Sequence, residues 1–180
     1  MNATVEQLAP VEQQATTSWV VAALYQFKEV QDPTDLQQRL LDLVNSINLC
    51  GTLIVAGEGI NGTVAGDRDA IDQIHQFLLN EGFNSLEYKE SHSDEKPFRK
   101  MKIKLKSEIV TLGVEVKPRD LVGHYLDAKE WNDLIARDDV ILIDTRNDYE
   151  YKAGTFKGAL DPKTESFREF PEYVKQNLEQ

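Results

Sequence analysis

The order in which apolar patterns follow one another between residues 19 and 106 constrains the fold of this chain most strongly. Residues 19–27, 52–56, 63–65, 86–91 and 99–106 have the composition of strands. Apolar side chains recur at helical spacing over residues 36–47 and 71–78, with typical helix starts at Asp32-Pro33 and Asp67 and ends at Gly51 and Gly82. The order strand, helix, strand, strand, helix, strand, with one extra strand, predicts a ferredoxin-like α+β domain over residues 18–112.

The rest of the chain predicts a second unit of the α/β class over residues 124–180. Residues 113–123, which include Lys117-Pro118-Arg119, have linker composition, and residues 1–17 are expected to form a flexible tail. In the second unit we expect a short strand at 124–125, helices over 129–136 and 167–177, and a strand over 140–143 that is apolar on both faces.

The apolar run at 140–143 delivers Asp144 and Arg146 to its carboxyl end, where open parallel sheets bind ligands. Asp144 and Arg146 are therefore candidate site residues. The alternative is structural: Arg146 can pair with Glu150 four residues later, while Asp144 caps the helical turn that follows. The spacing favours the structural role for Arg146 and Glu150, and Asp144 is the better site candidate.

A glycine-rich hexapeptide, Gly57-Glu-Gly-Ile-Asn-Gly62, joins two of the predicted strands. Asn61-Gly62 is a strong signal for a type I′ hairpin, because both central residues of that turn need positive φ. The same glycines would let backbone amides approach a ligand closely, and Glu58 or Asn61 could contact a base edge. Two interpretations stay open: a bare turn, or a binding loop made of Gly57, Glu58, Gly59, Asn61 and Gly62.

Residues 99–106 alternate strictly between cationic and apolar side chains. The apolar ones are expected to face a core, which leaves a row of lysines on the other face at a repeat of about 6.6 Å. Such a row suits a phosphate backbone lying along the strand, and it is equally typical of an edge strand protected from aggregation. Phe98 and the cation after it could also stack on a base. The candidate cations are Arg99, Lys100, Lys102 and Lys104.

Charge and cysteine content limit the class of protein. With 31 acidic residues against 20 lysines and arginines, the chain has a net charge of −11, which argues against a protein that coats nucleic acid in general. Only the segment 89–119 is basic. A single cysteine, Cys50, excludes an internal disulfide and fits the cytoplasm. No apolar stretch is long enough to span a membrane, and the three histidines lack the spacing of a metal site.

Four motifs follow one another along the chain: Gly57-Glu-Gly-Ile-Asn-Gly-Thr-Val-Ala-Gly66, Phe98-Arg-Lys-Met-Lys-Ile-Lys104, Ile143-Asp-Thr-Arg-Asn-Asp-Tyr-Glu150 and Thr164-Glu-Ser-Phe-Arg-Glu-Phe-Pro-Glu-Tyr173. Taken in this order, they resemble the bacterial rhodanese-domain tRNA uridine hydroxylases. The resemblance implies an acylphosphatase-like domain followed by a rhodanese domain, and oxygen-dependent hydroxylation of the wobble uridine of tRNA to 5-hydroxyuridine. It also implies that the lysine face and the glycine turn help to hold tRNA, and it identifies no cofactor beyond molecular oxygen as co-substrate.

Two departures from the family pattern lie in the second unit. Thr155 occupies a position where rhodanese domains usually have histidine, and no position matches their Cys-Thr-Gly-Gly-x-Arg-Cys type loop. Cys50 lies in the other domain and cannot supply that nucleophile. We therefore expect an incomplete rhodanese domain over 124–180, belonging to a longer enzyme whose catalytic cysteine lies beyond Gln180. The alternatives are a rhodanese-type sulfurtransferase and a non-catalytic RNA-binding module. No partner other than tRNA is indicated: neither DNA nor a membrane is expected, and the oligomeric state is not implied.

Overall fold

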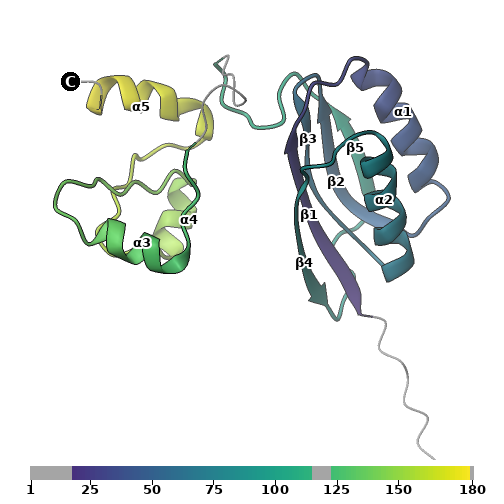
Figure 1. Ribbon diagram of the computed structural model, residues 1–180, viewed down its shortest axis with the longest axis horizontal. Helices are drawn as coiled ribbons and strands as arrows, with labels where there is room; N and C mark the ends of the chain where they lie inside the picture. The colour runs from purple at the N-terminus through teal and green to yellow at the C-terminus, as the bar shows by residue number, and fades with distance from the viewer. Residues whose placement is uncertain (1–17, 115–122, 179–180) are drawn as a thin grey trace, which may run out of the picture.

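Five strands form one mixed sheet at the amino-terminal side of the protein (Figure 1). The computed structural model describes residues 18–114 and 123–178, so the predicted tail and most of the predicted linker lie outside the described residues. The strands are β1 (Trp19–Phe27), β2 (Leu49–Ala56), β3 (Gly59–Gly66), β4 (Glu87–Ser93) and β5 (Met101–Leu105). Their order in the sheet is β4-β1-β3-β2-β5.

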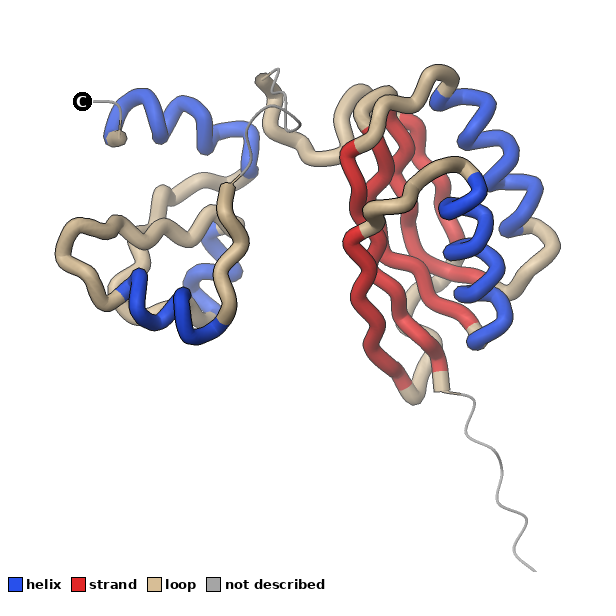
Figure 2. The backbone as a smooth tube through the Cα atoms, in the orientation of Figure 1, coloured by secondary structure: helices blue, strands red, loops and turns tan. Residues whose placement is uncertain are grey.

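The first four strands have the ferredoxin-like arrangement, as the sequence predicts. β1 lies between β3 and β4 and is antiparallel to both, and β3 is antiparallel to β2. The extra strand β5 joins the outer edge of β2 in parallel orientation. Helices α1 (Pro33–Val44) and α2 (Arg68–Asn80) both cover the same face of the sheet, and we call the other side the open face (Figure 2).

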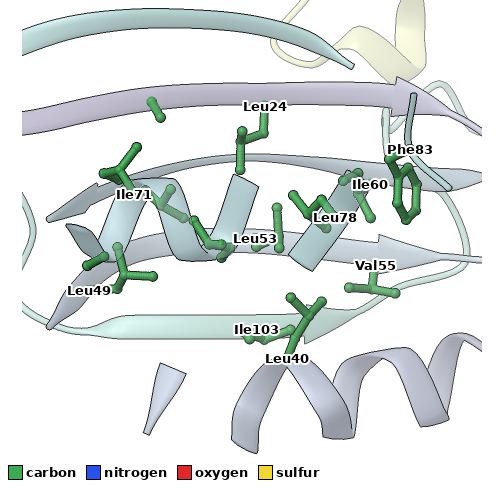
Figure 3. Packing of buried hydrophobic residues seen from close by; sticks show 14 of the residues in the cluster. Leu24, Leu40, Leu49, Leu53, Val55, Ile60, Ile71, Leu78, Phe83 and Ile103 are labelled. Atoms are coloured by element: carbon green, nitrogen blue, oxygen red, sulfur yellow. The ribbon is translucent and has the colours of Figure 1, made fainter. Parts of the chain in front are cut away.

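The hydrophobic core lies between the two helices and the sheet (Figure 3). Every second residue of each inner strand points toward the helices, as the period of a strand requires. Leu24, Leu53 and Ile60 come from the sheet, and Leu40 and Ile71 from the helices; all five are at most 1% exposed. Asp32 and Asp67 cap the two helices by accepting backbone N–H bonds, which confirms the predicted helix starts.

The end of α1 was predicted wrongly. Gly51 is typical of a helix end, but the helix stops at Val44 and Gly51 lies inside β2. The glycine is required because the neighbouring strand comes very close: a Cβ at this position would lie 2.2 Å from the carbonyl oxygen of Thr63. Close approach between strands, rather than helix termination, explains this residue.

The predicted type I′ turn at Asn61-Gly62 is also wrong. Ala56 pairs with Gly59, so the hairpin turns through Gly57 and Glu58 alone. Asn61 and Gly62 lie inside β3, where they pair with β1 on one side and β2 on the other. The side chains of Glu58 and Asn61 contact the loop after β5, as described below.

The carboxyl-terminal segment contains helices α3 (Ala128–Ile135), α4 (Asp148–Ala153) and α5 (Phe170–Asn177), with a 3-10 turn, η1 (Phe167–Glu169), before the last. The predicted strands at 124–125 and 140–143 do not form. Ile143 makes one parallel bridge with Leu160, and Ile141 is 64% exposed. A strand that is apolar on both faces needs neighbours on both sides, and the described residues supply one bridge. Assignment of this segment to a rhodanese domain stays a prediction.

Among the described residues, an ion pair between Glu108 and Arg168 joins the loop after β5 to the carboxyl-terminal segment. Glu108 accepts the backbone N–H groups of Leu112 and Gly113, and Arg168 donates to it from Nη2 at 2.8 Å. The pKa of the Glu108 carboxyl is lowered, mainly by the Gly113 N–H and further by Arg168. No helix in the described part of the chain is long and apolar enough to cross a membrane.

Candidate functional site

Of the lysines predicted to bind a phosphate backbone, Lys102 and Lys104 lie on the edge strand β5, and Lys100 directly precedes it. In its pairing with β2, Lys102 lies opposite Thr52 and Lys104 opposite Ile54. Ile103, between the two lysines, is buried toward the helices. Because side chains alternate along a strand, Lys102 and Lys104 project from the open face. The predicted alternation and the edge position are both confirmed.

These cations have no acidic partners in the part of the chain that the structure describes. None of the ion pairs formed between described residues involves Arg99, Lys100, Lys102 or Lys104. All four residues are exposed. Arg39, Arg68, Arg137, Arg146 and Arg168, by contrast, each pair with a carboxylate. The positive charge beside β5 is therefore available to an external anion.

A hollow of about 670 Å³ lies beside these cations. It is lined by Gly51 and Thr52 of β2 and by Pro97, Phe98, Arg99, Lys100 and Lys102. The connection from β4 to β5 crosses the sheet here, and Lys96 in it lies 5.5 Å from the ring centroid of Trp19. The structure therefore brings Phe98 together with three of the four predicted cations around one cavity, which we call the basic hollow; Lys104 does not line it.

The predicted binding residues of the hairpin contact another part of the protein. Glu58 accepts the backbone N–H of Ile109 at 2.6 Å, and Asn61 donates from Nδ2 to the carbonyl oxygen of the same residue at 2.9 Å. Ile109 is 2% exposed. Both polar groups of one backbone residue are thus satisfied, and the loop after β5 is held against the hairpin. Substrate binding by Glu58 and Asn61 stays a prediction.

The three glycines of the hairpin differ in their surroundings. A Cβ on Gly59 would lie 2.1 Å from the carbonyl oxygen of Gln26, and one on Gly62 would lie 2.2 Å from that of Thr52. At Gly57 no atom lies within 4 Å of such a Cβ. Protein backbone therefore accounts for Gly59 and Gly62, while Gly57 faces open space and remains available to a ligand.

Asp144 and Arg146 form a compact polar cluster in the carboxyl-terminal segment. Arg146 donates to Asp144 from Nη2 at 2.6 Å and from Nε at 2.9 Å, and its Nη2 also donates to the carbonyl oxygen of Gly154 at 2.7 Å. Thr155 donates its hydroxyl to Asp144 at 2.8 Å. The Arg146 guanidinium holds the pKa of the Asp144 carboxyl well below its usual range, with a further contribution from Thr155. Asp144 is therefore a fixed anion and not a proton donor at neutral pH.

A cavity of about 520 Å³ opens over this cluster. Trp131 and Phe156 line it with ring centroids 5.3 Å apart, and Leu142, Ile143 and Ala159 add apolar surface. The Asp144 side chain is 9% exposed and the Arg146 side chain 48% exposed. Arg146 is thus oriented by the buried acid while part of its guanidinium faces the cavity. Apolar walls with a few oriented polar groups are typical of small-molecule sites.

The predicted structural pairing of Arg146 with Glu150 is wrong. Arg146 pairs with Asp144 instead. Glu150 forms a capping box at the start of α4, where it accepts the backbone N–H of Asn147. Asn147 is the residue before the helix, so Asp144 does not cap it. Sequence spacing alone could not distinguish an acid two residues before the arginine from one four residues after it.

A third hollow, of about 270 Å³, lies on the open face and was missed by the sequence analysis. Ala23 and Tyr25 of β1, Thr63 of β3 and Glu87 and Lys89 of β4 line it, together with Leu24, Asn61, Gly62 and Tyr125. The signal that could have found it is the alternation along β1, which sets Ala23 and Tyr25 on the face opposite Leu24. We call it the tyrosine hollow.

Cys50 is buried, and its thiol donates to the carbonyl oxygen of Ala65 at 3.4 Å. It is a packed side chain of β2, as the sequence indicates. His75 stacks on Tyr88 with ring centroids 4.4 Å apart. Among the described residues, no group of three or more histidine, cysteine or acidic side chains is arranged to hold a metal ion.

Comparison with known proteins adds independent observations. Residues 19–109 match the family described as the UPF0176 acylphosphatase-like domain. The chain is 90% identical over its 180 residues to the tRNA uridine(34) hydroxylase of Acinetobacter baumannii strain AYE, and spans 57% of that relative's length. It is 87% identical to the protein of that name in Acinetobacter baylyi, again spanning 57%. For the Deinococcus radiodurans protein of that name, identity is 58% over 169 residues, or 94% of this chain and 56% of the relative.

Proposed function

Since the chain belongs to the family of the UPF0176 acylphosphatase-like domain, we propose that it is part of an enzyme that hydroxylates the wobble uridine of tRNA to 5-hydroxyuridine, with molecular oxygen as co-substrate. Curated relatives that are 90% and 87% identical to this chain carry the name tRNA uridine(34) hydroxylase, which supports this reaction. The chain spans little more than half the length of those relatives. The activity therefore belongs to the whole enzyme, which would act in the cytoplasm with tRNA as its partner.

The observation that carries the proposal is the basic hollow with the lysine row of β5. A protein with a net charge of −11 repels nucleic acid on average, so binding requires a local surface of opposite sign. Lys100, Lys102, Lys104 and Arg99 provide that surface, free of internal ion pairs among the described residues. Phosphate contacts of this kind supply affinity and orientation.

Asp144 and Arg146 have a different role in the proposal. Asp144 accepts two N–H groups from the guanidinium, so it orients Arg146. Arg146 can then donate to an oxygen of the substrate in the cavity next to Trp131 and Phe156. By the family resemblance, the reactive cysteine of this site would come from residues that this chain does not contain, because its one cysteine, Cys50, is buried in the other domain. Within this chain, Asp144 and Arg146 are residues near the reacting base.

A salt series tests the proposed tRNA surface. We expect the triple change of Lys100, Lys102 and Lys104 to Glu to weaken tRNA binding, and to make the slope of log K against log salt shallower by about 0.7–0.9 for each phosphate that a cation no longer neutralises. Fluorescence anisotropy with labelled tRNA measures both quantities. The matched control changes Lys129, Lys152 and Lys175 to Glu, which alters net charge equally on other exposed residues. Equal weakening by both triple variants, or none by the first, would contradict the proposal.

Two alternatives make different predictions. A sulfurtransferase needs a reactive thiol, and the one cysteine of this chain is buried, so sulfur transfer would also depend on residues outside it. A thiosulfate-to-cyanide assay on the whole enzyme separates that activity from hydroxylation. The burial of Cys50 also supports the second alternative, that this chain by itself is an RNA-binding module. Formation of 5-hydroxyuridine by the 180-residue chain alone would exclude that alternative.

A further inference from the structure

The tyrosine hollow on the open face has the size and composition of a site for one planar ring. Its volume of about 270 Å³ lies near the lower end of ligand cavities, which suits a single base better than a whole nucleotide. Tyr25 provides an aromatic surface on β1. Phe27 packs edge-on against it with ring centroids 5.4 Å apart, which restricts the orientation of the Tyr25 ring. Aromatic rings on the open face of a sheet can stack unpaired bases.

Polar groups at the hollow have defined orientations. The Asn61 amide must present its nitrogen to Ile109, because the partner there is a carbonyl oxygen and can only accept. Its Oδ1 atom is therefore left to accept a hydrogen bond from another donor. Thr63 lies on the same strand two residues away and can donate or accept. An N–H group on the edge of a base would meet an oriented acceptor at Asn61.

The charge around this hollow differs from the charge around the basic hollow. Burial raises the pKa of the Tyr25 hydroxyl, and Tyr125, Glu58 and Glu87 raise it further. The two nearby carboxylates make the tyrosine hollow unfavourable for a phosphate, although Lys89 offsets part of their charge. They favour the N–H groups of a base edge. The cations around the basic hollow have the opposite preference, so the two cavities suit the two ends of a nucleotide.

The strand register connects the two cavities. Lys102 pairs with Thr52, Thr52 with Thr63, and Thr63 with Ala23, so one row of the open face runs from the basic hollow to the tyrosine hollow. Thr52 lines the first cavity, and Thr63 and Ala23 line the second. Neighbouring strands are about 4.8 Å apart, so Lys102 and Thr63 are separated by about 10 Å across the sheet. Thr52, a small polar residue, occupies the position between them.

We propose that the open face binds a single-stranded segment of tRNA, with phosphates along Lys102 and Lys104 and one unpaired base on Tyr25 beside Asn61 and Thr63. This inference rests on the proposed function and adds a base-binding site to it. Only an unpaired base can enter the hollow, because a base in a duplex is stacked and paired. Double-stranded RNA would reach the lysines alone.

Binding of a single-stranded oligoribonucleotide and of a duplex of the same sequence to the 180-residue chain tests this site. Base stacking on an aromatic side chain predicts that Tyr25→Ala weakens single-strand binding by about 5- to 150-fold, with the salt slope unchanged. Tyr25→Phe should bind like the unmodified chain, because the stacking surface remains. Tyr25→Ala should leave duplex binding within about twofold. Tyr149→Ala, at an exposed tyrosine on α4, is the matched control and should leave both affinities unchanged.

The outcomes separate this site from the proposed function. If the lysine variants weaken tRNA binding but Tyr25→Ala binds the single strand normally, the base site is wrong and the tRNA surface stands. If the lysine variants also bind tRNA normally, both the base site and the proposed tRNA surface are wrong. Equal losses for single strand and duplex in Tyr25→Ala would mean that the substitution disturbs β1 as a whole, and would overturn the base site. Thr63→Val, which keeps the shape and removes the hydroxyl, provides a second variant: an unchanged single-strand affinity would exclude a contact at Thr63.

Discussion

Replacing Gly62 by Ala tests whether the hairpin glycines serve the fold or a ligand. Gly62 lies in β3 between β1 and β2. A Cβ added there would lie 2.2 Å from the carbonyl oxygen of Thr52 and 2.8 Å from the Cα of Leu53. Both are backbone atoms of β2, which cannot rotate away as the end of a side chain can. The substitution must therefore move one strand relative to the other.

The cost follows from this geometry. Cβ atoms in proteins essentially never lie closer than 3.0 Å to another heavy atom, and this separation would be 2.2 Å. β2 and β3 must therefore separate or shift by about 0.8 Å, the difference between the two distances. Overpacking of this kind costs about 1–3 kcal/mol, and each weakened ladder hydrogen bond adds about 1 kcal/mol. We expect Gly62→Ala to lower the free energy of unfolding by about 2–4 kcal/mol. At about 4–8 °C per kcal/mol for a domain of this size, Tm falls by roughly 8–30 °C.

Urea and thermal unfolding followed by circular dichroism measure this loss. Gly57→Ala is the matched control, since it lies in the same hairpin with no atom within 4 Å of its added Cβ and without a positive φ. It should be neutral or more stable by up to about 1 kcal/mol. Equal stability of the two variants would refute the steric account of Gly62. A weaker affinity for tRNA in Gly57→Ala, at unchanged stability, would indicate that the turn approaches the ligand.

Two further predictions concern the hydrogen bond between Glu58 and Ile109 and the ion pair between Arg146 and Asp144. Glu58→Ala removes the acceptor for the Ile109 N–H, so hydrogen exchange at the Ile109 amide should accelerate and the free energy of unfolding should fall by about 1–3 kcal/mol. Glu58→Gln keeps an acceptor oxygen and should lose less stability. Unchanged exchange in Glu58→Ala would show that Glu58 does not hold the Ile109 amide. Arg146→Gln should raise the pKa of Asp144 toward its usual range, as followed by carboxyl NMR titration. Because the folded pKa is lowered, the stabilisation from this contact is present above the ordinary carboxyl pKa of about 3.9 and is lost as pH falls toward the lowered value; a pKa that does not move in Arg146→Gln would show that Arg146 is not the cause.

Local patterns were sufficient for most of the first domain. The caps at Asp32 and Asp67, the two helices and the alternation of β5 depend on neighbours within a few residues. The same holds for the buried Cys50. Failures occurred where a residue has a common local use and a different tertiary one. Gly51 and Asn61-Gly62 are typical of helix ends and turns, yet inside the sheet they accommodate a close strand or hold Ile109.

The candidate site also combines features that local sequence patterns predict with features that depend on tertiary contacts. The lysine row could be predicted because alternation determines which side chains share a face of a strand. The tyrosine hollow could not, since it requires β1, β3 and β4 to lie side by side, and strand order is a property of the whole sheet. The pairing of Arg146 with Asp144 rather than Glu150 likewise depends on residues further along the chain. Gly154 accepts a hydrogen bond from Arg146, and Thr155 donates one to Asp144.

By itself, the sequence determined which residues are cationic, which alternate and which helices begin at a capping acid, because those properties are set by composition and by the period of each element. Only the tertiary structure decided that β5 joins the edge of β2, that the lysines and the tyrosine hollow share one open face, and that Glu58 and Asn61 contact Ile109. These outcomes depend on pairing between segments far apart in the sequence, such as Ala23 with Lys89 and Glu58 with Ile109. The gain from burying both partners outweighs the local preference of either one.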